Sequence, residues 1–384
     1  LHGIDIDARA IQLSAAAMWL KAKLYAPEVE LSRMNLVAPI FRLGALPKDD
    51  PALMQLCDEL ARFLVPKEVT LKLVEALSGV DHLGTLLRVD DEVAQLLEVE
   101  QRADKPLLVH AARKVRSQVL DRLTDFLDEH ATEADLGLRL EGEQMAAGVR
   151  FASIARKGVY DIVVANPPYQ GISKTSSMGY VVKHYPRGKA DLYAAFMIRG
   201  LELCRSGGLC AMVTMQGWMF VSQFSALRKW VLEEHSLRCI GDLAWCAFEN
   251  MRHATIAMAV VGAGPHTPAA AVAVMPTALG EREESIPALA RKKAALWAQV
   301  ARYEFDVTQL AAIRGAPLVY WWGEQELRTY LAAPKLGEVA PARQGLATAN
   351  GTRFLRSPWE TVSYTHLRAH ETKANLVCRL LLEK

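Results

Sequence analysis

The chain has 384 residues, of which 51% are hydrophobic and 23% are charged, a composition typical of globular proteins. Its formal net charge of +2 excludes a uniformly basic nucleic-acid-binding body, although a local basic patch remains compatible with it. No apolar run reaches the roughly 18 residues that a membrane-spanning helix needs, so we expect no membrane partner.

The cysteines indicate a reducing environment. The sequence has six, and none forms a CxxC pair or shows zinc-ligand spacing with histidine. We therefore predict free thiols, no bound metal and a cytoplasmic location. The six are Cys57, Cys204, Cys210, Cys239, Cys246 and Cys378.

The first third of the chain begins with strand character and becomes helical. Residues 1–6 predict a short strand, followed by a helix from about Ala8 whose apolar residues recur at spacings of three and four. Residues 34–41 predict a second strand. From Pro47 to Gln144 the pattern is amphipathic and helical, which indicates an insertion into an α/β domain.

Strands and helices alternate in the next part. Residues 160–165 predict a buried strand, and the following helix has Asp191 at its N-cap and Gly207-Gly208 at its end. Alternation of this kind predicts a mostly parallel sheet covered on both faces. The remaining elements are a helix at 224–235 and strands at 209–215, 237–243 and 253–263.

The ends of the chain depart from these patterns. After about Pro265 the order weakens, with a helix expected at 286–302 and a different domain beginning after it. Residues 362–384 break with the preceding apolar pattern and resemble translated sequencing-adapter read-through, so we exclude them from fold reasoning. Because the chain opens as though within a strand, we expect an internal fragment of a longer protein.

Two aspartates follow the first strand. In "GIDID" (residues 3–7), Asp5 lies at the carboxyl end of the strand, and Asp7 is in position to cap the helix. An α/β nucleotide-binding fold places a carboxylate at this point because it accepts hydrogen bonds from both ribose hydroxyls. Ordinary turn and cap roles are the alternative interpretation.

The segment Asn166-Pro167-Pro168-Tyr169 ends the strand at 160–165, at the sheet edge where open α/β folds bind ligands. The prolines fix two φ angles and remove two N–H donors, and Asn166 is restricted to extended conformations because it precedes a proline. The result is a rigid shelf that offers the Asn166 side chain, the Pro167 carbonyl and the Tyr169 ring. Such a shelf suits a planar base with an exocyclic amino group.

At these residues the sequence resembles a known family. "DIVVANPPY" is similar to the catalytic motif of N6-adenine methyltransferases that use S-adenosylmethionine, and "GIDID" is similar to their ribose-binding strand. The segment order is that of the gamma class. The longer stretches "KADLYAAFMIRGLELCRSGGLCAMVTMQGWMF" and "AFENMRHATIAMAVV" resemble the large adenine methyltransferases of BREX-type phage-defence systems.

The resemblance implies an α/β, Rossmann-like sheet that binds S-adenosylmethionine and methylates N6 of a flipped adenine in double-stranded DNA. Other subunits of a phage-defence complex are further expected partners. The implied segments are a truncated part of the methyltransferase domain (1–46), a helical insertion (47–150), the catalytic part (151–265), a linker and the start of a target-recognition domain (266–361), and a non-native tail (362–384).

The resemblance also implies roles for individual residues. Asn166 and Pro167 would hold the adenine amino group and, with Pro168 and Tyr169, form the catalytic motif. Tyr169 would stack on one face of the base, and Phe248 would close on the other. The cofactor-binding residues implied are Asp5, Asn166 and Asp191, and the methionine end would bind a loop lying before residue 1.

Several residues keep two interpretations. Asp191 is alternatively a plain helix cap, Phe248 a core residue, and Trp218 either a border of the base pocket or core packing. Arg187, Lys189 and residues 290–297 could contact phosphates or form a solvated surface. His184 and His253 have no nucleophile or metal partner in the sequence, so they receive no role.

Three other functions are alternatives, and the first two of them share the motif. Enzymes that methylate glutamine in release factors and some RNA adenine methylases are compact, whereas the helical insertion and further domain expected here favour DNA. A non-catalytic DNA-binding subunit with the same fold is the third alternative, and the intact Asn-Pro-Pro-Tyr motif argues against it.

Overall fold

The computed structural model describes residues 1–30, 34–39, 67–77, 80–88, 151, 154–174, 178–245, 247–248, 255–264, 270–276 and 286–339, with single positions between 49 and 61. The chain divides into two compact units, the first Leu1–Trp321 and the second beginning at Trp322. Most of the expected helical insertion (89–150) and the expected tail (362–384) lie outside the described residues.

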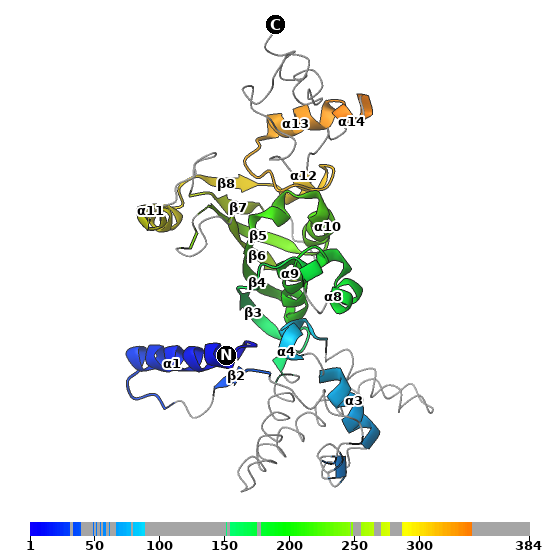
Figure 1. Ribbon diagram of the computed structural model, residues 1–384. Helices are drawn as coiled ribbons and strands as arrows, with labels where there is room; N and C mark the ends of the chain where they lie inside the picture. The colour runs from blue at the N-terminus through cyan, green and yellow to red at the C-terminus, as the bar shows by residue number, and fades with distance from the viewer. Residues whose placement is uncertain are drawn as a thin grey trace, which may run out of the picture. The chain divides into compact units, whose positions relative to one another are not determined.

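A six-stranded sheet forms the centre of the first unit, in the order β3-β4-β6-β5-β7-β8 (Figure 1). Helices α9 (Leu192–Leu203) and α10 (Ser225–Glu234) pack against it, α9 on β3 and β4 and α10 on β5. This mixed α/β architecture confirms the expected fold class. The strands are β3 (Tyr160–Ala165), β4 (Cys204–Met215), β5 (Ser236–Ala244), β6 (Ile256–Gly262), β7 (Ala271–Val274) and β8 (Arg302–Phe305).

The sheet is less parallel than the sequence predicts. β3 pairs with β4, and β5 with β7, in parallel, but β6 lies between β4 and β5 and is antiparallel to both. The physical reason is the short connection from β5 to β6, which leaves no room for the crossover that a parallel neighbour requires. β3, β4, β5 and β7 nevertheless point the same way, so their carboxyl ends share one edge.

The α9–β4 junction corrects another expectation. Gly207 and Gly208 do not end the helix, because α9 stops at Leu203 and β4 begins at Cys204. Both glycines lie within β4, where its register with β3 shifts and Gly207 has a φ of +79°. A left-handed φ favours glycine in a strand irregularity as much as at a helix end, so the local sequence does not distinguish the two.

The sheet continues beyond residue 265, the expected end of the catalytic part. β7 and β8 extend it, and the helix before β8 is α11 (Ile286–Trp297), shorter than the expected 286–302. The chain turns after α11 through Gln299 and Ala301, whose φ angles are 52° and 51°. Helix α12 (Val307–Ala311) then packs on α10.

A separate two-stranded parallel sheet, β1 (His2–Ile4) with β2 (Asn35–Val37), carries the N-terminal acidic residues. Helix α1 (Ala8–Tyr25) follows β1, and the Asp7 carboxylate caps it by accepting from the Arg9 N–H at 2.9 Å. α3 (Lys67–Leu77) and α4 (Val80–Leu83) are the helices described from the expected insertion, followed by the 3₁₀ helix η2 (Gly84–Leu86).

The described part of the second unit contains α13 (Glu324–Ala332) and α14 (Leu336–Val339). Within it, the Trp322 and Tyr330 rings pack with their centroids 5.3 Å apart, and Lys335 lies over the Tyr330 ring. None of the helices in the described parts of the chain combines the length and the hydropathy that a bilayer crossing requires.

Candidate active site

The Asn-Pro-Pro-Tyr motif leaves the carboxyl end of β3. This strand is not buried as the sequence predicts, because it lies at the edge of the sheet, where Ile162 is 63% and Val164 is 75% exposed. Asn166 and Pro168 are exposed, whereas Pro167 is buried and Tyr169 is half-buried. The Tyr169 hydroxyl donates to Asn166 Oδ1 at 3.0 Å, and its ring meets Tyr193 edge-on with centroids 6.3 Å apart. Burial raises the pKa of Tyr169, so its hydroxyl keeps its proton at neutral pH. The motif therefore presents a polar amide beside an anchored aromatic ring.

Asp191 caps α9, as one of its two interpretations predicts. Its carboxylate accepts from the Tyr193 N–H at 3.3 Å and from the Gln170 N–H at 3.1 Å. Burial raises the pKa of Asp191, and these backbone hydrogen bonds oppose the rise. Because Gln170 follows Tyr169 directly, Asp191 joins the end of the motif to the beginning of α9.

Asp5 lies just after β1, and its carboxylate accepts from the Asp7 N–H at 2.8 Å. The Asp5 N–H donates to the Val37 carbonyl at 3.2 Å, which continues the β1–β2 pairing. The side chain of Asp5 is exposed. Both aspartates of "GIDID" thus occupy the positions that the sequence indicates.

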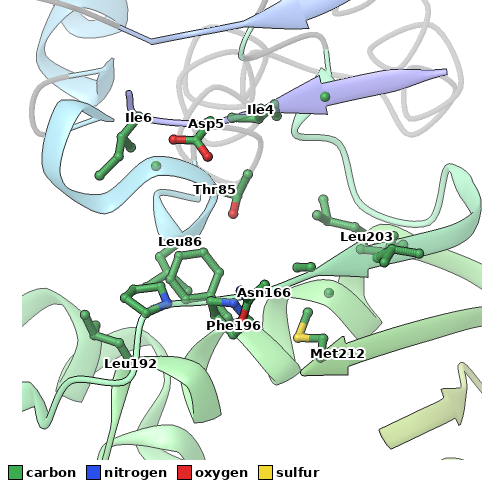
Figure 2. Close-up of a pocket in the computed structure, with 18 of the residues that line it drawn as sticks. Ile4, Asp5, Ile6, Thr85, Leu86, Asn166, Leu192, Phe196, Leu203 and Met212 are labelled. Carbon is green, nitrogen blue, oxygen red and sulfur yellow. The ribbon is translucent and has the colours of Figure 1, made fainter. Parts of the chain in front are cut away.

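A cavity of about 950 Å³ brings Asp5, Asn166, Pro167 and Pro168 together. In Figure 2 the side chain of Asp5 lies on one side of this space and Asn166 on the other. Tyr169, Asp191 and Phe248 do not line it. The remaining walls come from β1, β3, β4, α9 and the segment around η2. Their apolar residues include Ile4, Leu83, Leu86, Ile162, Val164, Phe196 and Met212, and their polar residues include His2, His82, Thr85, Tyr160 and Gln170.

Other sequence candidates lie elsewhere. Phe248 follows β5 and is 38% exposed. Trp218 is fully buried and donates from Nε1 to Thr214 Oγ1 at 3.1 Å, which agrees with its interpretation as a core residue. Arg187 lies 5.6 Å from the Trp230 ring centroid and pairs with Glu234. His253 is outside the described residues.

Helix α11 contains the basic segment 290–297. Its Lys292 is buried and donates to the main-chain oxygens of Leu243 and Trp245, so this amine holds the end of β5. His184, on α8 (Met178–His184), stacks on Tyr180 with centroids 4.2 Å apart. Among the residues that the structure describes, no group of three or more His, Cys, Asp or Glu side chains could hold a metal ion.

A buried polar network that no motif indicates lies at the same edge of the sheet. Asp242, near the end of β5, accepts from Gln216 Nε2 at 2.7 and 2.9 Å and from the Tyr320 hydroxyl at 2.8 Å. Burial, with the Asp242 charge beside it, raises the pKa of Tyr320, which therefore remains a donor. The network ties the ends of β4 and β5 to the last residues of the first unit.

The sequence of this chain is similar to a family model and to several known proteins. Residues 1–246 match the family model described as Eco57I restriction-modification methylase. The chain is 26% identical over 389 residues to the adenine-specific methyltransferase PglX of Lacticaseibacillus casei (strain Zhang), covering 95% of this chain and 28% of that protein. It is 28% identical over 207 residues to the adenine-specific methyltransferase BrxX of Escherichia coli O9:H4 (strain HS), covering 53% of this chain and 16% of that protein.

The chain thus spans less than a third of the length of either curated relative. Among solved structures it is similar to a nuclease-deletion mutant of the Type ISP restriction-modification enzyme LlaGI in complex with a DNA substrate mimic. The TM-score is 0.39 at 11% identity, and the match covers 85% of this chain and 25% of that one.

Proposed function

Because the chain belongs to the Eco57I restriction-modification methylase family, we propose that it carries the catalytic part of an adenine-specific DNA methyltransferase. The reaction is transfer of a methyl group from S-adenosylmethionine to N6 of adenine in double-stranded DNA. A nitrogen–carbon bond would form as the carbon–sulfur bond breaks, S-adenosylhomocysteine would leave, and the amino nitrogen would lose one proton. The observation that carries the proposal is that Asp5, Asn166 and Pro167 line the same cavity.

The cavity fits the nucleoside part of the cofactor. Its volume of about 950 Å³ lies within the usual range for ligand pockets, and its lining combines apolar side chains with polar ones that include Asp5, Thr85 and Asn166. The exposed Asp5 carboxylate can accept hydrogen bonds from both ribose hydroxyls. When bound, S-adenosylmethionine supplies a methyl group on a positively charged sulfur that an amine can attack.

Asn166 and Pro167 would orient that amine. The Asn166 side-chain oxygen and the Pro167 carbonyl accept the two N–H protons of the adenine amino group, which turns the nitrogen lone pair toward the methyl group. Since positioning and polarisation accomplish this, the mechanism assigns no covalent nucleophile or metal to the chain. Pro168 keeps the shelf rigid.

The aromatic residues would hold the base after it leaves the duplex. Tyr169 stacks on one face, and Phe248 on the loop after β5 closes on the other, because a flipped base loses its neighbours and regains stacking from aromatic rings. Asp191 would act on the cofactor site indirectly. It caps α9, and Leu192 and Phe196 of this helix line the cavity.

We further propose that the protein acts in phage defence or restriction-modification together with other subunits. Support comes from the family description and from the curated relatives PglX and BrxX. Since its substrate would be intracellular DNA, we place the protein in the cytoplasm. Methylation of protein glutamine or of RNA adenine, and a non-catalytic role in DNA binding, are the alternatives that the experiment must separate.

The test is Asn166→Ala in the full protein. We expect N6-methyladenine in DNA to fall at least about 100-fold, because one preorganised hydrogen-bonding group contributes that much to a transition state. Mass spectrometry of digested DNA measures the product, and calorimetry measures S-adenosylmethionine affinity, which should largely survive.

Gln12→Ala is the matched control, because it removes an exposed amide from α1 without touching the cavity. Undiminished DNA methylation by Asn166→Ala would refute the assigned role. If the wild-type protein instead methylates RNA or a release-factor glutamine and leaves DNA unmodified, the DNA proposal fails.

A further inference from the structure

A short segment distant in sequence from every motif forms one wall of the cavity. Gly84, Thr85 and Leu86 of η2 line the space together with Asp5 and Asn166. They lie in the segment expected to be a helical insertion, about 80 residues from Asp5 and from Asn166. No spacing pattern in the sequence marks them as part of a site.

Buried side chains from the expected catalytic part (151–265) hold this segment by donating hydrogen bonds to its main-chain oxygens. Arg199 Nε donates to the Thr85 carbonyl at 2.8 Å, and the Tyr185 hydroxyl donates to the Leu86 carbonyl at 2.7 Å. Arg199 and Tyr185 are both fully buried. The Arg88 N–H in turn donates to the Tyr180 hydroxyl at 2.8 Å. The backbone of η2 is therefore fixed from three places on α8, α9 and the turn between them.

The residue after Asp5, Ile6, lies beside Gly84 of η2. Gly84 has a φ of +50°, and a Cβ built on it would lie 3.2 Å from Ile6 Cγ2. A larger residue would be strained in this conformation and would press on the chain beside Asp5. Gly84 thus lets η2 approach the end of β1, which places Thr85 near the Asp5 carboxylate.

The Thr85 side chain faces the cavity while its main chain is engaged elsewhere. Figure 2 shows Thr85 and Asp5 projecting into the same space above Asn166. Among the described residues the Thr85 hydroxyl has no hydrogen-bond partner, and the side chain is half-buried. A hydroxyl both donates and accepts, whereas a carboxylate only accepts, so the two groups complement each other around a diol.

We propose that Thr85 is a cofactor-binding residue whose hydroxyl contacts the ribose hydroxyls of S-adenosylmethionine opposite Asp5, with Leu86 and Phe196 offering apolar surface to the base. This inference rests on the proposed function. It makes part of the expected insertion a wall of the cofactor site, held there by Arg199 and Tyr185.

The experiment compares Thr85→Val with Thr85→Ser in the full protein. Calorimetry with S-adenosylhomocysteine should show about fivefold weaker binding for Thr85→Val, since one hydrogen bond contributes about 1 kcal/mol and 1.4 kcal/mol is tenfold. Thr85→Ser keeps the hydroxyl and should bind within about twofold of wild type. With 2′,3′-dideoxy S-adenosylhomocysteine, which lacks the diol, the difference between wild type and Thr85→Val should vanish.

Two results would overturn the inference. One is wild-type affinity of Thr85→Val for S-adenosylhomocysteine while Asp5→Asn binds weakly, which leaves the proposed function intact. The other is that Thr85→Val binds the dideoxy compound more weakly than wild type by the same factor as it binds S-adenosylhomocysteine. This result would place the Thr85 hydroxyl away from the ribose. Failure of the proposed function looks different: the wild-type protein itself would bind no S-adenosylhomocysteine.

Discussion

Asn166 Oδ1, the oxygen proposed to receive the adenine amino group, already accepts a hydrogen bond from the Tyr169 hydroxyl. An amide oxygen has two lone pairs, so it can accept from the base and from Tyr169 together. The hydroxyl would then orient the amide, while the ring, supported edge-on by Tyr193, would stack on the base. The two parts of Tyr169 therefore have separable roles.

Replacing Tyr169 separates these roles. We expect Tyr169→Phe to lower the single-turnover methylation rate by about 2- to 10-fold, the contribution of one hydrogen bond. Tyr169→Ala should lower it by a further factor of roughly 5 to 150, because the stacking surface is lost as well. If the two variants were equally slow, the hydroxyl and not the ring would be the essential part.

At the scale of elements, His235 joins the end of α10 to the beginning of β5. Its Nδ1 accepts from the Gly264 N–H at 3.2 Å, and its ring lies edge-on to Trp230 with centroids 4.3 Å apart. Burial lowers the pKa of His235, Arg187 lowers it further, and Glu234 acts in the opposite direction. The folded protein therefore holds this imidazole neutral.

Stability should consequently depend on pH through His235. As the pH falls below about 6.5, the unfolded chain binds a proton that the folded chain does not, so the free energy of unfolding decreases. The loss is complete below the folded pKa, where both states are protonated. Urea unfolding between pH 7.5 and 5 should show a shallower decline for His235→Asn, which retains an acceptor. Parallel curves for the two proteins would contradict this assignment.

Across the first unit as a whole, Arg228 connects the middle of the chain to its later part. The buried guanidinium donates to the carbonyls of Trp218 and Val221, both at 2.7 Å, and to those of Gly315 and Ala316. Tyr320 reaches Asp242 nearby. These bonds explain why the first unit extends to Trp321 and does not end near residue 265.

Removing this connection should destabilise the first unit. Arg228→Leu leaves several buried carbonyls unpaired, each costing about 1–3 kcal/mol, so we expect a loss above about 3 kcal/mol in chemical denaturation. Arg205→Ala is the control, because its ion pair with Asp161 is exposed and should contribute less than about 1 kcal/mol. A comparable loss in both variants would show that burial of Arg228 is unimportant.

The sequence by itself determined what depends on neighbouring residues. Asp7 and Asp191 cap helices because a side-chain oxygen reaches an N–H two residues ahead, and the motif from Asn166 follows a strand because two prolines end the pairing. The α/β alternation is likewise a local signal. The position of Asp5 after β1 follows from the same short-range pattern.

Only the tertiary structure decided which distant segments meet. The antiparallel position of β6, the strands β7 and β8, the wall at Thr85, the network at Asp242 and the buried Arg228 all depend on contacts between residues far apart in sequence. Every residue has a carbonyl that can accept a hydrogen bond, so a bond such as that from Arg199 to Thr85 leaves no pattern in the sequence. Asn-Pro-Pro-Tyr is therefore recognisable from its letters, whereas the cavity beside it required the fold.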